Sequence, residues 1–330
     1  MAAGLRAEQQ ALYVKDMYKA EYESYTETPT VHDKIYKVVT KGVTGAGNKE
    51  TQLLGAGDLE RHTVEGQDIN FKSPKEGWSF YVKYHTFSDG LSLTKEAVAD
   101  TVKLGDLLKT LANSWGLSLR VLKETFAARV FNNGGTLLGD FVFNGTHTGN
   151  TDPSGDLLYD SEPLFNLTGN TRSTKGGGTY YNSVALLTLT PGNFETVYNL
   201  HTATNNRDER DRVMENPADT LLTRKGAEHF SAVRILESTQ MPGGQLNDTN
   251  VYKSLVTPIA WDYLTDGTTY KAFYIGKRQH RDFQWHDRQM PEIDFFRDNT
   301  NRGYKASIDT RFGAFIKNFR CWSRGGGTSA

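Results

Sequence analysis

The chain has 330 residues, and its 38 basic and 39 acidic side chains leave a formal net charge of -1. That balance excludes strong electrostatic steering toward nucleic acid or an acidic membrane. The single cysteine, Cys321, excludes an internal disulfide and a zinc cluster of paired cysteines, which fits a reducing cytosol. No apolar run reaches the ~18 residues of a membrane span, and the first residues are too polar for a signal peptide. The length predicts one large or two modest domains.

Residues 1–52 are predicted to form an extended arm that begins with a short helix over residues 8–23. The arm is rich in tyrosine, a side chain that offers a large contact area with a polar tip. Few residues in this segment could form a core of their own. We therefore expect the arm to lie on another molecule, with Tyr18 and Tyr22 at contacts between subunits. A disordered polar tail is the alternative interpretation.

Residues 53–93 are predicted to form a β-hairpin extension. Strand-like runs over 63–71 and 78–88 flank a turn cluster at 72–77. An isolated two-stranded hairpin is marginally stable, so we expect this one to rest on a neighbouring molecule. The side chains expected to be buried there lie on one face of the second run, at a period of two: Trp78, Phe80 and Tyr84. The alternative is an edge hairpin in the sheet of the same domain.

Residues 104–132 carry one long helical pattern. Its apolar side chains recur every three or four residues, at Leu104, Leu108, Leu111, Trp115, Leu119, Leu122, Phe126 and Val130. At about 1.5 Å per residue the helix would span roughly 43 Å. The mean helix of about 11–12 residues is much shorter. So long a helix is typical of a protein whose copies tile a surface. The alternative is an ordinary core helix of an α+β domain.

The ends and glycines of this helix also follow from the sequence. A turn at Asp89-Gly90 and a short helix over 91–100, capped by Thr94, are predicted before it. Gly105 separates the two helices, and Gly116 marks either a bend or a site of close packing. The Asn-Asn-Gly-Gly run at 132–135 favours a left-handed cap at its end.

The composition and the predicted elements change twice along the rest of the chain. Residues 136–183 are rich in Gly, Asn, Thr, Ser and Asp, and helices are predicted over 193–203 and 218–238. Strands are predicted over 256–260, 270–275, 283–285, 293–296 and 305–308, with a hairpin turn at 299–303.

Catalytic and metal-binding patterns are scarce. His280, Asp282, His286 and Asp287 form the most metal-like cluster, but the arginines around them favour salt-bridged strand pairing instead. Neither a dinucleotide fingerprint, nor a phosphate-binding loop, nor a nucleophile elbow occurs. We therefore expect no catalytic residue, no cofactor and no metal.

The order of these segments resembles the major capsid protein of tailed bacteriophages, which has the Hong Kong 97-type fold. The run SFYVKYHTFSDGLSLTKEAVADTVKLGDLLKTLANS resembles the passage from extended loop to spine helix, and VFNNGG resembles the exit from that helix. DTLLTRKGAEHFSAVRILES and TPIAWDYLTDGTTYKAFYIGKR resemble the axial domain, with the Mu-like prophage head subunits as the nearest group. The resemblance covers most of the chain and rests on order and spacing.

The resemblance implies an α+β fold with an N-terminal arm, an extended β-hairpin loop, a long spine helix, and peripheral and axial domains. The implied division is an arm at 1–52, an extended loop at 53–93, a peripheral domain at 94–185 and 278–315 with the spine helix at 104–132, and an axial domain at 186–277 and 316–330.

The implied function is self-assembly into hexamers and pentamers that close an icosahedral head shell around double-stranded DNA. The implied partners are further copies, portal and scaffolding proteins and, in some relatives, decoration proteins. The implied location is the virion, after assembly in the host bacterial cytoplasm and without a membrane. Contact with DNA is expected to be weak and independent of sequence. An encapsulin-like compartment shell and an unrelated cytosolic enzyme are the alternatives.

Some features of relatives are not expected here. The arm starts soon after Met1, so a separate scaffolding protein is expected rather than a long propeptide. Lys72, Lys75 and Lys83 lie in the hairpin, but no partner asparagine for an isopeptide cross-link is identifiable.

Contacts between subunits are expected at two further places. The charge run RDERDR would lie on a loop at the ring axis and pair across subunits through Arg207, Asp208, Glu209, Arg210, Asp211 and Arg212. A solvated charge run is the alternative, since exposed pairs stabilise little. The strands over 285–312 would meet neighbours at threefold positions, with Arg297 and Arg302 in contact. Gly105 and Gly116 are expected as flex points when a shell expands.

Overall fold

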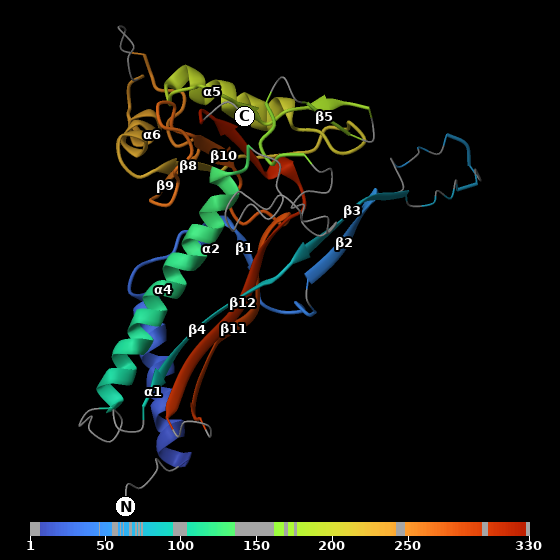
Figure 1. Cartoon of the computed structure of the whole chain (residues 1–330). Coiled ribbons are helices and arrows are strands. Elements are labelled where there is room, and N and C mark those ends of the chain that lie inside the picture. Colours follow the sequence, from blue (N-terminus) through green and yellow to red (C-terminus); the bar gives the residue numbers. More distant parts are fainter. Residues whose placement is uncertain are drawn as a thin grey trace, which may run out of the picture. The chain divides into compact units, whose positions relative to one another are not determined.

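The computed structural model describes most of the chain. It covers residues 7–45, 47–54, 59, 61, 63–65, 68, 69, 71, 73, 75–94, 104–135, 162–167, 171–174, 177–241, 248–298 and 303–327, with the backbone alone for 7–9, 48–54 and 75–83. The chain divides into two compact units (Figure 1). Unit 1 comprises residues 1–46, 84–130 and 279–315, and unit 2 comprises residues 47–83, 131–278 and 316–330. Helices and sheets occur in both, which confirms the α+β class.

Unit 1 is built on a four-stranded sheet in the order β1-β11-β12-β4. The strands are β1 (Lys37–Val39), β4 (His85–Leu93), β11 (Phe283–Arg297) and β12 (Tyr304–Ile316). β1 is parallel to β11, and β4 is antiparallel to β12 along its whole length. β11 and β12 are longer than the short strands predicted there, because residues that the sequence pattern left out continue the same ladder.

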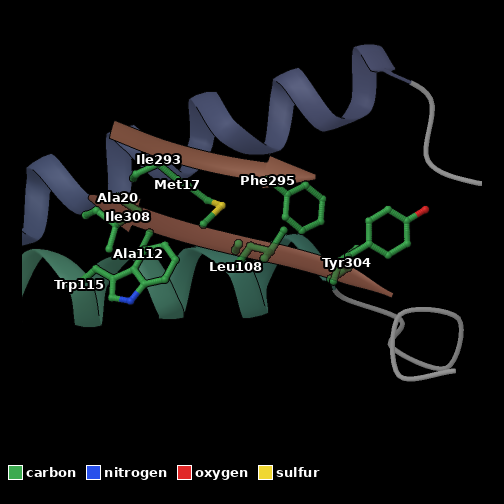
Figure 2. Packing of buried hydrophobic residues seen from close by; sticks show 11 residues of the cluster. Met17, Ala20, Leu108, Ala112, Trp115, Ile293, Phe295, Tyr304 and Ile308 are labelled. Atoms are coloured by element: carbon green, nitrogen blue, oxygen red, sulfur yellow. The ribbon is translucent and has the colours of Figure 1, made fainter. Parts of the chain in front are cut away.

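Two long helices pack with this sheet. They are α1 (Ala7–Thr26) and α4 (Leu104–Asn132), whose bounds are those that the sequence predicts for the long helix. Figure 2 shows side chains from both helices and from β11 and β12 pointing toward one another. The cluster comprises Met17, Ala20, Leu104, Leu108, Ala112, Trp115, Ile293, Phe295, Tyr304, Ala306 and Ile308. The apolar stripe of α4 therefore faces a core within its own chain.

The arm is also part of this core, contrary to expectation. Met17 on α1 is fully buried, and the Tyr36 ring, after the short helix α2 (His32–Ile35), stacks on Phe283 with centroids 4.4 Å apart. The Tyr36 hydroxyl donates to the Ala127 carbonyl oxygen at 2.9 Å. The arm does lack a core of its own, but the expectation that it lies on another molecule is wrong for these residues, because they pack against α4 and β11 of the same chain.

Unit 2 contains a five-stranded sheet in the order β7-β13-β10-β8-β9. Its strands are β7 (Ser183–Val184), β8 (Thr220–Arg224), β9 (Thr257–Trp261), β10 (Phe273–Gly276) and β13 (Trp322–Gly325). Its helices are α5 (Pro191–Asn199), the π-helix η1 (Leu200–Thr204), α6 (Ala227–Glu237) and the 3-10 helix η2 (Phe319–Cys321). A short pair, β5 (Arg172–Ser173) and β6 (Thr179–Tyr180), lies beside the Gly-rich turn. The core of unit 2 includes Phe194, Leu221, Ile235 and Phe273.

The first part of one predicted helix is a strand. The pattern over 218–238 predicts a single helix, but residues 220–224 form β8, between β10 and β9 in the sheet. Thr220 and Thr223 are fully buried, as expected for a strand that is covered on both faces. Gly226, at a φ of +123°, then separates the strand from α6.

The predicted hairpin forms with a different first strand. β2 (Gly47–Leu54) pairs with β3 (Lys75–Lys83), with an irregularity between Thr51 and Leu53. The described residues of the run 63–71 are in neither strand nor helix. The predicted turn at Asp89-Gly90 and the helix start at 91–93 are wrong as well, because these residues belong to β4 and pair with β12. Residues 95–100 and 299–302 lie outside the described residues.

Candidate assembly interface

The two arm tyrosines differ in exposure. The Tyr18 hydroxyl oxygen accepts from the Ile293 backbone N–H at 2.8 Å, and 37% of this residue is exposed. Tyr22, one turn further on α1, is 67% exposed. Tyr22 is therefore the arm tyrosine that presents most of its ring to solvent, while Tyr18 also ties α1 to β11.

Tyr84 lies inside its own chain. It is 2% exposed, and its hydroxyl is 2.9 Å from Nδ1 of His286. Tyr84 stands between the end of β3 and the start of β4, so the run 78–88 is two strands rather than one. The expected contact of Tyr84 with a neighbouring subunit is thus replaced by a partner on β11. The side chains of Trp78 and Phe80 lie outside the described residues.

The segment between β2 and β3 exposes apolar side chains that the sequence reasoning missed. Leu59, Val64, Ile69 and Phe71 are 64–102% exposed. Single exposed apolar residues are common, but a cluster within one segment marks an interaction surface. The available signal was the presence of these four large apolar residues in an otherwise polar stretch.

The charge run forms a closed loop. The Asp208 carboxylate accepts from the backbone N–H of Arg210 and of Arg212 and pairs with the Arg212 guanidinium at 2.8 Å. The Asp211 carboxylate accepts from the Tyr180 hydroxyl at 2.7 Å and from the Thr174 hydroxyl and the Gly178 N–H. The hydrogen bond from Tyr180 lowers the pKa of the Asp211 carboxyl, with Thr174 and Gly178 adding to it against desolvation.

Glu209 anchors this loop to the interior of unit 2. Its Oε1 lies 2.7 Å from the Arg320 guanidinium, and both side chains are buried. The Arg320 guanidinium also stacks on Phe319, 4.4 Å from the ring centroid. The expectation that all six charged residues pair across subunits is therefore wrong for Asp208, Glu209 and Asp211, whose carboxylates are bonded within the chain. Arg207 and Arg212 are the exposed members of the run.

The two glycines of α4 differ in their surroundings. A Cβ at Gly116 would lie 2.4 Å from the Glu21 carbonyl oxygen and 3.0 Å from Ser24 Cβ. A Cβ at Gly105 would lie 3.4 Å from Tyr13 Cε1, an ordinary contact distance. Of the two interpretations of Gly116, the structure favours close packing, since α1 and α4 approach each other there. The Ser24 hydroxyl donates to the Asn113 carbonyl oxygen at 2.8 Å beside it.

The expected threefold contacts lie at one end of the long hairpin. Arg297 is exposed at the end of β11, next to the half-exposed Phe296. Asp298 pairs with Lys305 across the two strands at 2.7 Å. Arg302 lies outside the described residues.

A buried polar cluster joins α2, α4 and β11. Glu124 Oε1 accepts from the N–H of Val31 and of His32 and lies 2.8 Å from His32 Nδ1. Beside it, Lys123 Nζ lies 2.9 Å from Asp287 Oδ1. Burial raises the pKa of the Glu124 carboxyl, but the hydrogen bond and charge of His32 and the two N–H donors lower it below its ordinary value.

The metal-like cluster is dispersed by the fold. His286 uses both ring nitrogens, since Nδ1 faces the Tyr84 hydroxyl and Nε2 lies 2.8 Å from Gln284 Oε1. Asp287 Oδ1 accepts from Trp285 Nε1 and from Lys123. Among the described residues, no group of three or more metal-ligating side chains converges. Within that same part of the chain, no helix has the length and apolar character needed to cross a bilayer.

A long helix beside a four-stranded sheet, a two-stranded extension and a separate five-stranded unit define the Hong Kong 97-type capsid fold. No protein-family model and no curated protein sequence matches the chain. Solved structures do resemble it. A virus-like particle from Pyrococcus furiosus aligns with a TM-score of 0.52 and 9% identity over 94% of this chain and 98% of that one.

Two further structures agree with the first. The capsid of the native GTA particle aligns with a TM-score of 0.51 and 10% identity, covering 92% of each chain. Mycobacterium phage Patience aligns with a TM-score of 0.51 and 13% identity, over 100% of this chain and 90% of that chain. At such identities the likeness establishes the fold, which is the fold of capsid proteins.

Proposed function

We propose that the chain is a major capsid protein that self-assembles into hexamers and pentamers and encloses phage double-stranded DNA in an icosahedral head shell. The observation that carries this proposal is the capsid fold over more than nine-tenths of the chain. The exposed apolar segment between β2 and β3 supports it, because such a segment needs a cover that the described part of the chain does not supply.

The domain roles follow from this proposal. Residues 1–52 act as the arm and 53–93 as the extended loop, except that β2 (Gly47–Leu54) joins the loop and β4 (His85–Leu93) joins the sheet of unit 1. Residues 94–185 and 278–315 act as the peripheral domain, and 186–277 and 316–330 as the axial domain. The extended loop lies over the next subunit, with Trp78 and Phe80 in the contact, and heterologous contacts of this kind close into rings. Tyr18, Tyr22, Arg207, Arg210, Arg212, Arg297 and Arg302 make further contacts between subunits. Gly105 allows α4 to flex during shell expansion, whereas Gly116, expected as a second flex point, packs closely against α1.

The partners are further copies of the chain, a portal, a scaffolding protein and packaged DNA, and decoration proteins where a phage has them. The near balance of acidic and basic residues makes DNA contact weak and non-specific. The chain acts as a shell component rather than as an enzyme, in the virion, after assembly in the host bacterial cytoplasm. We assign it to the neighbourhood of the Mu-like prophage head subunits on the order of its segments.

Negative-stain microscopy of the purified full chain, with size-exclusion chromatography over a range of concentrations, tests the proposal. Rings or closed shells are expected. A single species with the mass of one chain at every concentration contradicts it. Shells that hold protein cargo instead of nucleic acid would indicate a protein compartment, such as an encapsulin, rather than a phage head.

A further inference from the structure

A lysine and an aspartate face each other in the interior of unit 1. Lys123 Nζ on α4 lies 2.9 Å from Asp287 Oδ1 on β11, and the two side chains are 6% and 9% exposed. The rings of Tyr25 and Phe312 flank the ammonium group, with centroids 5.7 and 5.6 Å from Nζ. In such apolar surroundings an ion pair loses much of its advantage over a neutral amine beside a carboxylic acid. An amine and a carboxylic acid differ from an amide by one water.

The Asp287 carboxyl is oriented by a second donor. Trp285 Nε1 donates to Asp287 Oδ1 at 3.0 Å, the same oxygen that the Lys123 ammonium contacts. A donor at this oxygen stabilises the negative charge that develops there when an amine attacks the carboxyl carbon. Two groups held together in this way react as parts of one molecule, without the entropy loss of a bimolecular encounter. The geometry therefore favours attack of the lysine nitrogen on the aspartate carbon.

A third group, on α1, is suited to carry the proton. Glu21 is 6% exposed, and burial raises the pKa of its carboxyl, although the charge of Lys123 acts to lower it. A carboxyl with a raised pKa is an effective general acid and base. Glu124 is not suited, because despite its burial the contact with His32 lowers its pKa. The close packing of α1 on α4 at Gly116 fixes the backbone of Glu21.

We propose that Lys123 and Asp287 form an isopeptide bond within one chain after it folds, with Glu21 as the proton carrier. The neutral Lys123 amine attacks Cγ of Asp287, and the new C–N bond forms. Glu21 takes a proton from the nitrogen and delivers one to Oδ2, the C–Oδ2 bond breaks, and water leaves. One amine and one carboxylic acid thus give one amide and one water, without any further reactant.

The bond would lock the long helix to the sheet. Lys123 and Asp287 are 164 positions apart, so the amide closes a large covalent loop that links α4 with β11. Such a loop restricts the unfolded chain and so stabilises the folded one. Because both residues belong to the same copy, the reaction does not depend on assembly.

Mass spectrometry of the purified, folded full chain tests the bond. We expect a mass lower by one water than the sequence requires. Trypsin should release a branched peptide that joins residues 121–129 to residues 282–288, because it does not cleave after a modified lysine. A folded wild-type chain that yields residues 124–129 and 282–288 as separate peptides and no branched peptide would overturn the inference, leave an ordinary buried ion pair, and leave the proposed function standing.

Three variants assign the roles of the side chains. Lys123→Arg keeps a cation at the site but cannot form the amide, so the full mass is expected. Asp287→Asn should lose one ammonia instead of one water, because an amide nitrogen is then the leaving group. Glu21→Gln, with unchanged circular dichroism, should form the bond at least about tenfold more slowly. Glu21→Asp keeps an acid on a shorter stem and should react at an intermediate rate. Equal rates for all three forms of residue 21 would overturn the role of Glu21.

The same two helices provide a matched control pair. Lys109 Nζ on α4 lies 3.4 Å from Asp16 Oδ2 on α1, but these side chains are 49% and 40% exposed. In contact with water the ammonium and the carboxylate stay charged, and a protonated amine is not a nucleophile. We therefore expect no branched peptide that contains Lys109. Equal linkage at both pairs would show that burial does not direct the reaction and would overturn the inference.

Discussion

Nδ1 of His32 lies 2.8 Å from Oε1 of Glu124 in the interior of unit 1, although the two residues are 92 positions apart. The contact fastens the end of the arm to α4, since Glu124 also accepts from the backbone N–H of Val31 and His32. The arm is therefore attached to the helix by one buried carboxylate as well as by apolar packing.

This carboxylate makes stability depend on pH. The pKa of Glu124 in the folded chain lies below its ordinary value of 4.5, so its ionised form stabilises the fold. That contribution is fully present above about pH 4.5 and is lost as pH falls toward the folded-state pKa. We expect Glu124→Gln to reduce the free energy of unfolding at pH 7 by about 1–3 kcal/mol and to flatten its acid dependence. Urea unfolding at pH 7, 5 and 4 measures both.

The control for that experiment is Glu23→Gln on the exposed side of α1, where Glu23 pairs loosely with Lys19 at 3.8 Å. It is expected to change the free energy of unfolding by less than about 0.5 kcal/mol. Equal unfolding free energies for Glu124→Gln and the wild type at pH 7 would show that the His32–Glu124 contact does not hold the arm.

Gly116→Ala should destabilise the chain, although alanine normally favours a helix by about 1 kcal/mol over glycine. The added Cβ would lie 2.4 Å from the Glu21 carbonyl oxygen, so α1 and α4 must separate. We expect a loss of about 1–3 kcal/mol in the free energy of unfolding. Gly105→Ala, with its nearest neighbour at 3.4 Å, serves as the matched substitution and is expected to be neutral or stabilising. Similar stabilisation of both variants in urea titrations would refute close packing at Gly116.

Removal of one partner of the buried Glu209–Arg320 pair should strongly destabilise unit 2. Removing one partner of a buried pair leaves an uncompensated charge, which costs about 3–5 kcal/mol. Glu209→Ala is expected to lower the free energy of unfolding by that order. Asp262→Ala removes the exposed pair of Lys225 and Asp262, 3.2 Å apart, and should cost at most about 1 kcal/mol. Thermal unfolding compares the two, and an equally small effect of both would mean that loop 207–212 is not anchored by Arg320.

Shortening the extended segment should separate folding from assembly. Replacement of residues 55–74 by an Asn-Gly turn keeps β2 and β3 in one hairpin and removes Leu59, Val64, Ile69 and Phe71. Because these side chains are exposed in the single chain, the free energy of unfolding should change by less than about 1 kcal/mol. Shell formation, followed by light scattering, should be lost. Normal shells from this variant would mean that the segment does not join subunits.

The sequence reveals elements whose pattern is long and local. The apolar stripe from Leu104 to Val130 continues over seven turns, and α4 has the predicted bounds. The sequence pattern gives the wrong element where hydrogen bonding to neighbouring strands determines the conformation. Residues 220–224 fit a helix by spacing and become β8 only because β10 and β9 lie on either side. Likewise Asp89-Gly90 resembles a turn, yet β12 holds both residues in β4.

The candidate interface was harder to predict than the fold. Tyr84 and Glu209 were expected at contacts between subunits, and only their long-range partners His286 and Arg320 show that they are buried within the chain itself. The first strand of the hairpin could not be identified from the sequence, because β2 begins inside the segment predicted as arm. Exposed apolar side chains such as Phe71 become visible only when the rest of the chain is seen to leave them uncovered.

Sedimentation velocity of the unmodified full chain, from submicromolar to tens of micromolar, tests the central claim most directly. If copies of the chain cover one another's projecting segments, the mass should rise with concentration to rings and closed particles. A sedimentation coefficient that stays at the value of one chain throughout that range would contradict the account.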